Sequence, residues 1–446
     1  MELRVEELLE GTLLSKTLSF CPTCLKVIEA DLIETKDGVY LVKEHCGRRI
    51  VYKLENDAEF YREFRLNFED FVSQKLEIGE TVLDAWRKKL NTMPCPQVYI
   101  TSKCNMKCKV CFIRDALKER DMKPEELGEL LEIYKGKTIT LTGGEPTIHP
   151  QFFEILDIIR KKGKRAWVLT NGTMLDEESF VRKMKEKKVY RVCLSFDGWK
   201  PEIYEKWRGV NGEEWLKRKE KAIELLRKYN VPTNIFMVVS KENIDELPKV
   251  IDFIIRDENK FIKDLWAISL YPSDTRPSDV VEKVSKTYNI PKEYFYELKR
   301  LKWNAFKVYY RLKPNKKEVD TDMLYDIIFF KIEDGTIKPL FPLEEVKRMN
   351  RKIEKILNMP IGKFLLHLPL LLPELIRYIR AKLNHYRRKD LALTLSRILT
   401  PENIDLNRDF NLGLDLLFYL YLKKPEELER LDEPLPGVPM CAIKGI

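Results

Sequence analysis

The sequence predicts an α/β protein centred on a partial barrel of six β/α units, with a small N-terminal cysteine-bearing unit and a mostly helical C-terminal region. Three observations support this prediction. Short β-rich runs alternate with longer helical patterns from residue 97 to about residue 272, as expected for a parallel sheet with helices outside it. Cysteines flank a hairpin-like stretch near the N-terminus, and the pattern after residue 290 is mostly helical. We therefore expect units at residues 1–92, 93–289 and 290–446.

The composition is that of an ordinary globular protein. The chain has 446 residues, more than one compact core needs, and 44% of them are hydrophobic and 34% charged. It has no run of 18 apolar residues, and its first residues, MELRVEELLEG, lack the basic-then-apolar pattern of a signal peptide. We therefore expect a cytoplasmic protein. In a reducing compartment, the spacing of the nine cysteines favours metal ligands over disulfides.

The positive charge of the chain is concentrated in one segment. The formal net charge is +9, and residues 351–389 contain ten Lys and Arg but only two acidic residues, a local charge of +8. The remainder of the chain is close to neutral, so we expect no nucleic-acid partner. The basic segment is still compatible with a local anionic partner.

Six β-rich runs define the central unit. They are residues 97–101, 138–144, 166–172, 189–198, 233–240 and 265–271. Six β/α units are too few for the eight-fold barrel, which favours an open or partial barrel. A doubly wound sheet stays open as an alternative, because periodicity does not specify strand order.

The N-terminal unit contains a candidate metal site. Cys21 and Cys24 lie in FCPTC, Cys46 follows a hairpin-like stretch in EHCG, and Cys95 in MPCP is the candidate for closing the set. His45 is a competing fourth ligand. The arrangement resembles a rubredoxin-like or zinc-ribbon knuckle, a closed tetrahedral site for iron or zinc. The alternative is that Cys46 or Cys95 is a buried thiol.

A second cysteine group follows the first predicted strand of the central unit. Cys104, Cys108 and Cys111 in CNMKCKVCF have a C-x3-C-x2-C spacing, and the loop is expected at the carboxyl edge of the sheet, where barrel enzymes build their sites. A [4Fe-4S] cluster usually takes four thiolates. Three thiolates would therefore leave one iron of the cluster without a protein ligand. The alternative from the spacing alone is a zinc site with a remote fourth ligand.

The next strand ends in LTGGEPTIHP, which places Gly143, Gly144 and Glu145 at the same edge. Glycines let a ligand approach the backbone, and a carboxylate suits an ammonium group. Together with the three-cysteine loop, this motif resembles the radical S-adenosylmethionine (radical SAM) superfamily over about residues 97–272. The resemblance implies a radical SAM barrel, a [4Fe-4S] cluster, S-adenosylmethionine and a reductant protein such as ferredoxin or flavodoxin.

The same resemblance implies roles for individual residues. The open iron would chelate the amino and carboxylate groups of S-adenosylmethionine, Glu145 would hold the methionine ammonium, and Gly143 and Gly144 would supply backbone contacts. Further contacts are expected from later strand ends: Asn171 in LTNG, and Ser195 and Asp197 in LSFDG. Asn-Gly and Asp-Gly are also ordinary turn dipeptides. No separate catalytic side chain is predicted.

Two cysteines stand outside these groups. Cys193 lies in a predicted central strand and is expected in the core. Cys441 has no cysteine near it in the sequence. Two interpretations are therefore open: a free thiol, or a ligand of a metal bound by residues far away in the chain.

Residues 361–389 combine apolar and basic residues. Leu375, Ile376, Ile379, Leu383 and Tyr386 share one helical face, and Arg377, Arg380, Arg387 and Arg388 occupy the others. One interpretation is a core-packing helix with a solvated basic face. The other is a helix that lies in a membrane interface, which would make the protein peripheral on the inner face of the membrane.

Taken together, FCPTC, the radical SAM motifs and this C-terminal region resemble the archaeal tetraether synthase group. The resemblance implies hydrogen abstraction from isoprenoid lipid chains and formation of carbon–carbon cross-links. The chain departs from that group between Cys46 and Cys104, where MPCPQ stands in place of a further cysteine cluster. One alternative is a radical methyltransferase or other modifier of a small heterocycle or peptide. A non-enzymatic iron–sulfur sensor or scaffold is the alternative from a different class.

Overall fold

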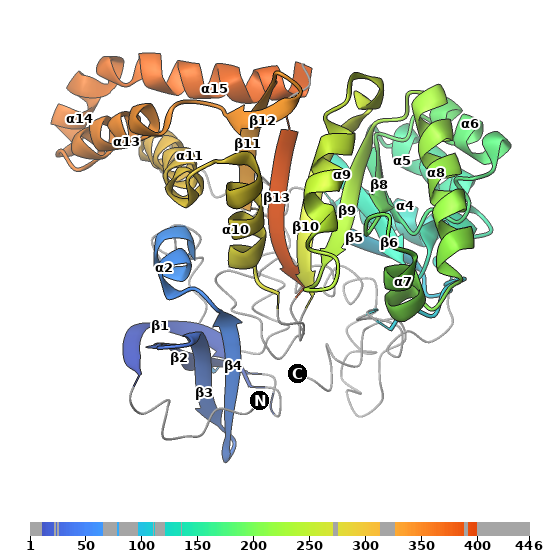
Figure 1. Cartoon of the computed structure of the whole chain (residues 1–446), viewed down its shortest axis with the longest axis horizontal. Coiled ribbons are helices and arrows are strands. Elements are labelled where there is room, and N and C mark those ends of the chain that lie inside the picture. Colours follow the sequence, from blue (N-terminus) through green and yellow to red (C-terminus); the bar gives the residue numbers. More distant parts are fainter. Residues whose placement is uncertain are drawn as a thin grey trace.

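The computed structural model of the chain describes residues 11–21, 24, 26–65, 78–79, 97–109, 111, 121–134, 136–270, 275–312, 326–387 and 391–398. A four-stranded sheet, a nine-stranded sheet with helices on it, and a group of C-terminal helices make up these parts (Figure 1).

Six parallel strands form the centre of the large sheet. They are β5 (Gln97–Thr101), β6 (Thr138–Gly143), β7 (Arg165–Thr170), β8 (Arg191–Ser195), β9 (Thr233–Val239) and β10 (Ile262–Leu270). Each strand pairs in parallel with the strand that precedes it in the chain. A doubly wound sheet would reverse its strand order at a switch point, so the sequential order excludes that alternative. The predicted α/β fold with six parallel strands is confirmed.

Helices cover one face of these strands (Figure 1). They are α4 (Pro124–Ile133), α5 (Phe152–Lys161), α6 (Glu178–Glu186), α8 (Gly212–Lys228) and α9 (Glu246–Ile254). Short turns connect them: η3 (Pro146–Ile148), α7 (Pro201–Ile203), η4 (Tyr204–Arg208) and η5 (Asp257–Asn259). Alternate strand residues such as Val168, Val192 and Ile235 share one buried apolar cluster with the helices. The other face of the same strands therefore carries the intervening residues, because side chains alternate along a strand.

The C-terminal region adds three strands to the sheet, which the sequence pattern did not predict. They are β11 (Asp326–Glu333), β12 (Thr336–Pro339) and β13 (Leu391–Ile398). β13 pairs in parallel with β10, β11 pairs antiparallel with β13, and β12 pairs antiparallel with β11. The run DIIFFKIEDGTIKP carried the signal, a β-rich stretch with an Asp-Gly turn.

The other elements that the structure describes in the C-terminal region are helical, as predicted. Its helices are α10 (Pro277–Tyr288), α11 (Lys292–Leu312), α13 (Leu343–Leu357), α14 (Ile361–His367), the turn η6 (Leu368–Leu370) and α15 (Leu372–Arg387). In the part of the chain that the structure describes, none of the helices combines the length and apolar character needed to cross a membrane.

A separate antiparallel sheet forms the N-terminal unit. Its strands are β1 (Thr12–Phe20), β2 (Val27–Thr35), β3 (Gly38–His45) and β4 (Arg48–Glu55), followed by α2 (Ala58–Phe60) and η1 (Tyr61–Arg65). Ser278 of α10 donates a hydrogen bond to Glu55 Oε1 at 2.5 Å. Lys299 of α11 donates to the carbonyl oxygen of Phe64. These two bonds attach the N-terminal unit to the helices that follow the barrel strands.

Candidate functional site

The three-cysteine loop begins just after β5. Cys104 and Cys111 are exposed and Cys108 is half-buried, and the N–H of Lys109 donates to the carbonyl of Trp207 at 2.8 Å. Although Cys104 is accessible at its surface, desolvation, together with the nearby charges of Glu145, Cys108 and Cys111, raises the pKa of its thiol to about 11. The three thiolates would repel one another, as the effect of Cys108 and Cys111 on the pKa of Cys104 indicates, and a cation bound between them would offset that repulsion. An iron–sulfur cluster supplies that charge, and the donor set therefore fits it.

Two glycines hold the end of β6 against this loop. A Cβ atom on Gly143, whose φ is +128°, would lie 2.0 Å from the carbonyl oxygen of Thr101, and one on Gly144 would lie 2.0 Å from that of Lys103. The N–H of Gly144 donates to Thr101 O at 2.7 Å, and the N–H of Glu145 donates to Lys103 O at 2.8 Å. The glycines are therefore required for close packing of two backbones. Their predicted contacts to S-adenosylmethionine stay a prediction.

Glu145 is a buried carboxylate that joins two strand ends. Its Oε1 accepts hydrogen bonds from Thr147 N at 3.1 Å, Thr147 Oγ1 at 2.5 Å and Thr170 Oγ1 at 2.6 Å. Its Oε2 accepts one from the N–H of Asn171 at 2.6 Å. Burial raises the pKa of Glu145, and these hydrogen bonds oppose that shift. The carboxylate is therefore fixed in position beside the cysteine loop.

Asn171 connects Glu145 to the cysteines. Its side-chain Nδ2 donates to Asn105 Oδ1 at 3.0 Å and lies 4.0 Å from Cys104 Sγ. The structure thus brings together Cys104, Glu145 and Asn171, which come from the ends of three neighbouring strands, as the sequence predicted.

Ser195 and Asp197 lie at the end of β8, where a residue that the sequence analysis missed contacts both. Arg208 donates from Nε to Asp197 Oδ2 at 2.8 Å and from Nη2 to Ser195 Oγ at 3.1 Å. Burial alone would lower the pKa of Arg208, but the charge of Asp197 raises it above its ordinary value. Asp197 Oδ1 also accepts from Val238 N at 2.9 Å. Asp197 therefore orients Arg208, which also hydrogen-bonds Cys108.

Lys219 is the second residue that the sequence analysis missed. It is buried on α8 and donates to the carbonyl oxygens of Asn171 and Ser195. Burial, reinforced by the positive charge of Arg208, lowers the pKa of Lys219 to about 7. A signal was present in the sequence, since Lys219 lies four residues after Trp215 and three before Ala222, on the apolar face of the helix.

The N-terminal cysteines form a separate site. Ligand atoms of Cys21, Cys24, His45 and Cys46 all lie within 4.8 Å of one another. His45 Nδ1 is 3.1 Å from Cys46 Sγ and 3.6 Å from Cys24 Sγ. Desolvation and the two other thiols raise the pKa of Cys46 to about 11, so a cation at this point would relieve the repulsion between thiolates. Three sulfurs and one imidazole are a zinc-type set.

Among the described residues, the fourth ligand-type side chain at this site is that of His45, the competing ligand. Cys95 and Cys441 lie outside the described residues. Cys193 is buried in β8, as expected for a core cysteine.

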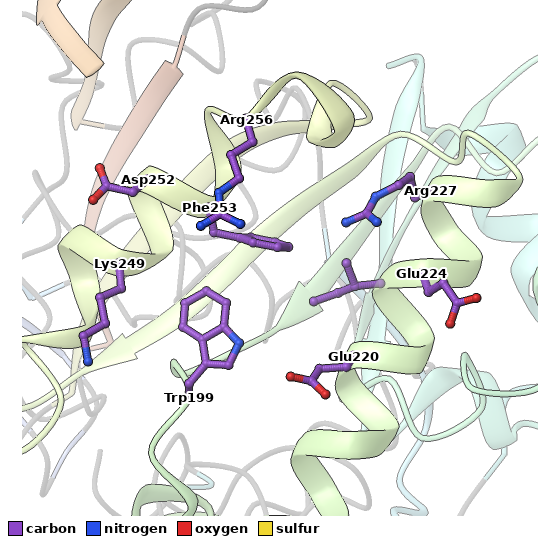
Figure 2. Close-up of a pocket in the computed structure, with 9 residues that line it drawn as sticks. Trp199, Glu220, Glu224, Arg227, Lys249, Asp252, Phe253 and Arg256 are labelled. Carbon is purple, nitrogen blue, oxygen red and sulfur yellow. The ribbon is translucent and has the colours of Figure 1, made fainter. Parts of the chain in front are cut away.

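A groove of about 580 Å³ lies between α8 and α9 (Figure 2). Trp199 and Phe253 form its apolar part, with ring centroids 5.3 Å apart. Its charged lining residues are Glu220, Glu224, Asp252, Arg227, Lys249 and Arg256. The lining residues include none of those predicted to bind the cluster or S-adenosylmethionine, and acids and bases are balanced in number. The groove therefore does not select a ligand by charge.

Two family models match the chain. Residues 98–254 match the Radical SAM superfamily, and residues 13–48 match the HMPTM N-terminal zinc ribbon domain. The chain therefore contains a radical SAM domain preceded by a cysteine-bearing unit of β-strands. Proteins of the radical SAM family use a [4Fe-4S] cluster and S-adenosylmethionine.

Curated relatives are similar to part of the chain. The 7,8-dihydro-6-hydroxymethylpterin dimethyltransferase of Methanocaldococcus jannaschii is 30% identical over 48% of this chain and 44% of its own length. The antilisterial bacteriocin subtilosin biosynthesis protein AlbA of Bacillus subtilis is 31% identical over 38% of this chain and 36% of its own length. The chain thus spans less than half the length of either relative. Neither is a tetraether synthase by its name.

Among solved structures, anSMEcpe with bound AdoMet aligns with a TM-score of 0.37 and 25% identity, over 51% of this chain and 61% of that chain. This TM-score is too low to support a comparison of details.

Proposed function

We propose that the protein is a radical SAM enzyme whose cluster is held by Cys104, Cys108 and Cys111. The observation that carries the proposal is the chain of contacts from the Cys104 loop through Asn171 to the buried carboxylate of Glu145. The bound cluster and S-adenosylmethionine would supply reductive cleavage of the sulfonium and a 5'-deoxyadenosyl radical for hydrogen abstraction. A reductant protein such as ferredoxin or flavodoxin would supply the electron.

The side chains at the strand ends have complementary charges for the methionine part of S-adenosylmethionine. Glu145 offers a carboxylate for the ammonium group. Arg208, half-buried on η4, offers a cation for the carboxylate group, and Lys219, buried on α8 with a pKa of about 7, offers a second cation below that pH. Asn171 and Ser195 offer neutral hydrogen-bonding groups. Both ends of the amino acid are therefore matched by groups that the fold already holds in place.

For the substrate, we propose a small nitrogen heterocycle of the pterin class, modified by methyl transfer or a related radical reaction. The pterin dimethyltransferase relative supports this class, and the match of residues 13–48 to a zinc ribbon model adds an N-terminal metal site to the same chain. The N-terminal site then has a structural role, because a closed four-ligand metal site contributes to folding.

A lipid substrate, with carbon–carbon bond formation on isoprenoid chains, is the second candidate. One observation favours it: seven large apolar residues are exposed on α14, η6 and α15. They are Ile361, Leu365, Leu366, Leu370, Leu372, Ile376 and Ile379, with Leu366 75% exposed. An exposed apolar patch of this kind marks an interaction surface, and a basic segment beside it suits an anionic membrane.

The two candidates are separated by product analysis. The protein is reconstituted with iron and sulfide under anaerobic conditions and supplied with a reductant and S-adenosylmethionine. We expect 5'-deoxyadenosine, and with 7,8-dihydro-6-hydroxymethylpterin a pterin product of increased mass. Formation of 5'-deoxyadenosine that increases only with isoprenoid lipid vesicles, with a lipid product two hydrogens lighter, would favour the second candidate. Absence of 5'-deoxyadenosine from protein with a full cluster would reject both.

A further inference from the structure

The face of the barrel strands opposite the helices carries an unusual group of polar side chains. Trp167, Arg191, Asn234 and Asp264 come from β7, β8, β9 and β10, and we call them the inner-face cluster. Their strand neighbours Val168, Val192, Ile235 and Leu265 pack against the helices. Because side chains alternate along a strand, the inner-face cluster lies on the side away from those helices. Ser195 shares this face with Arg191, since the two are four residues apart on β8.

The members of the inner-face cluster contact one another. Arg191 donates from Nη1 to Asn234 Oδ1 at 2.9 Å and lies 3.7 Å from Asp264 Oδ2. The guanidinium carbon of Arg191 lies 5.8 Å from the centre of the Trp167 ring. β-Sheet register explains the grouping, because Trp167 is paired with Arg191 and Asn234 with Asp264 across neighbouring strands.

Three N–H donors of the inner-face cluster lack a hydrogen-bond acceptor within the described part of the chain. Among the described residues, Trp167 Nε1, Arg191 Nε and Asn234 Nδ2 are buried and make no hydrogen bond. Asn234 as a whole is fully buried. A buried donor without a partner costs free energy. Three such donors beside one carboxylate indicate that a polar ligand completes their hydrogen bonds.

Aromatic rings lie next to these donors on the same face. Phe236 and Trp266 are each two residues further along β9 and β10, and both are half-buried. Their rings are stacked, with centroids 4.8 Å apart and planes inclined by 12°. They provide a flat apolar surface at the level of Ser195, because Phe236 is paired with Ser195 across β8 and β9. A planar ring with hydrogen-bonding groups on its edge matches this combination.

We propose that the inner-face cluster binds the hydrogen-bonding edge of a 2-amino-4-oxo pteridine, with Asp264 as the residue that recognises the 2-amino group. Asp264 accepts from the adjacent 2-amino and N3–H groups, and the three N–H donors face the oxygen and nitrogen acceptors of the ring. Arg191 lies roughly 13 Å along β8 from Ser195, at about 3.3 Å per residue. In this proposal the bicyclic ring lies along this span, with its far edge toward the S-adenosylmethionine site. This inference deepens the heterocycle function proposed above and rests on it.

Binding tests the assignment without any radical chemistry. The full-length protein is titrated anaerobically, without S-adenosylmethionine, with fluorescent 6-hydroxymethylpterin and with 6-hydroxymethyllumazine, in which an oxo group replaces the 2-amino group. We expect the parent to bind the pterin at least tenfold more tightly than the lumazine. Asp264→Asn should weaken pterin binding at least tenfold and reduce the preference below threefold.

Two variants separate recognition from folding. Trp266→Leu should weaken the binding of both compounds equally and keep the preference, because it removes only ring contact. Asp252→Asn, which lies in the outer groove between α8 and α9, should behave as the parent does. A melting curve for each variant reports its stability.

Three results would overturn the inference: no pterin binding by the parent, equal affinity of the parent for pterin and lumazine, or an unchanged preference in Asp264→Asn. The first two need only the parent protein, so an unstable variant does not prevent a decision. The radical function is assessed separately, from 5'-deoxyadenosine formed in the absence of any pterin. If that product forms while pterins do not bind, the pteridine assignment fails and the radical SAM function stands.

Discussion

The main-chain N–H of Asn171 donates to Glu145 Oε2 at 2.6 Å, which ties the end of β7 to the end of β6 beside Cys104. The side chain of Asn171 continues the connection, since its Nδ2 lies 4.0 Å from Cys104 Sγ. A change at any of the three positions should therefore affect the other two.

The three cysteines of the central loop should be individually essential. Replacing Cys104, Cys108 or Cys111 by Ala should remove the visible absorbance of the [4Fe-4S] cluster and all cleavage of S-adenosylmethionine, because each thiolate holds one iron. Iron content, absorbance and 5'-deoxyadenosine are measured after reconstitution. Cys193→Ala, at a buried position in β8, is the control and should keep all three. Full cleavage by any of the three loop variants would contradict the assignment.

The carboxylate of Glu145 should matter for binding as well as for folding. Glu145→Gln should weaken S-adenosylmethionine binding at least tenfold, because the charge that faces the ammonium group is lost. Thr170→Val is the matched control: it removes one hydrogen bond to the carboxylate and the bond that Thr170 Oγ1 accepts from the N–H of Gly172, and it keeps the charge of Glu145. Loss of the bond to the carboxylate alone should cost about 1.5–3 kcal/mol of stability. Equilibrium binding and melting curves are compared for the two variants. Equal loss of affinity in both would indicate a purely structural role for Glu145.

Lys219 should make stability depend on pH. Its pKa is about 7 in the folded protein, against an ordinary value of 10.5. Between these pH values the unfolded chain holds a proton that the folded protein lacks, so the free energy of unfolding rises with pH across this window. Lys219→Met should lose that rise while other groups titrate as before. Urea unfolding of both proteins at pH 6.5, 8 and 9.5 measures the free energy of unfolding at each pH. The same pH dependence of this free energy in both proteins would refute the lowered pKa of Lys219.

The N-terminal site should bind one metal independently of the cluster. We expect Cys21→Ala and His45→Ala each to lose this metal and to lower the stability of the N-terminal unit, since the closed site contributes to folding. Cys95→Ala should keep the metal, because His45 lies with the three cysteines. Metal analysis by mass spectrometry decides between His45 and Cys95. The main cluster should form in all three variants.

The exposed apolar patch should bind membranes if the lipid candidate holds. Replacing Leu365, Leu366 and Leu370 by Ser should then reduce co-sedimentation with anionic vesicles roughly tenfold or more, because the apolar area available for insertion is lost. The melting curve should change little, since these side chains are exposed. Leu13→Ser is the control, because Leu13 is 53% exposed at a distant position on β1.

Charge should act together with that patch. Arg377 already forms an ion pair with Glu345, so its contribution to binding should be smaller than that of an unpaired arginine. Raising the salt concentration should weaken binding to anionic vesicles by screening. Equal, negligible binding by the parent and the triple variant at low salt would remove the support for a lipid substrate.

Local patterns in the sequence determined much of the barrel. Each of the six strands was predicted within a few residues, because apolar alternation and flanking helical periodicity are short-range properties. The positions of Cys104, Glu145 and Asn171 near one another followed from the same reasoning, because parallel strands end at a common edge. The spacing of Cys21, Cys24 and Cys46 likewise indicated a metal site from sequence alone.

The assignment of helix faces shows where local pattern was insufficient. The sequence placed Leu375, Ile376 and Ile379 on one apolar face of the C-terminal helix. In the structure, Leu375 packs against the core together with Leu371 and Tyr378, while Ile376 and Ile379 are exposed. Which part of a wide apolar stripe is buried depends on the neighbouring elements, and the strands β11, β12 and β13 that extend the sheet were not predicted.

The sequence by itself determined the cysteine groups, the six strands and the acidic residue beside the glycines, since each depends on residues close together in the chain. Only the tertiary structure decided that Arg208 and Lys219 reach the site, that His45 stands with three cysteines, and that Arg191, Asn234 and Asp264 share one face. The physical reason is that burial and hydrogen bonding of these side chains depend on which distant segments become neighbours. In the sequence, Lys219 is an ordinary helical lysine. The structure shows that its ammonium group donates hydrogen bonds to the carbonyl oxygens of Asn171 and Ser195.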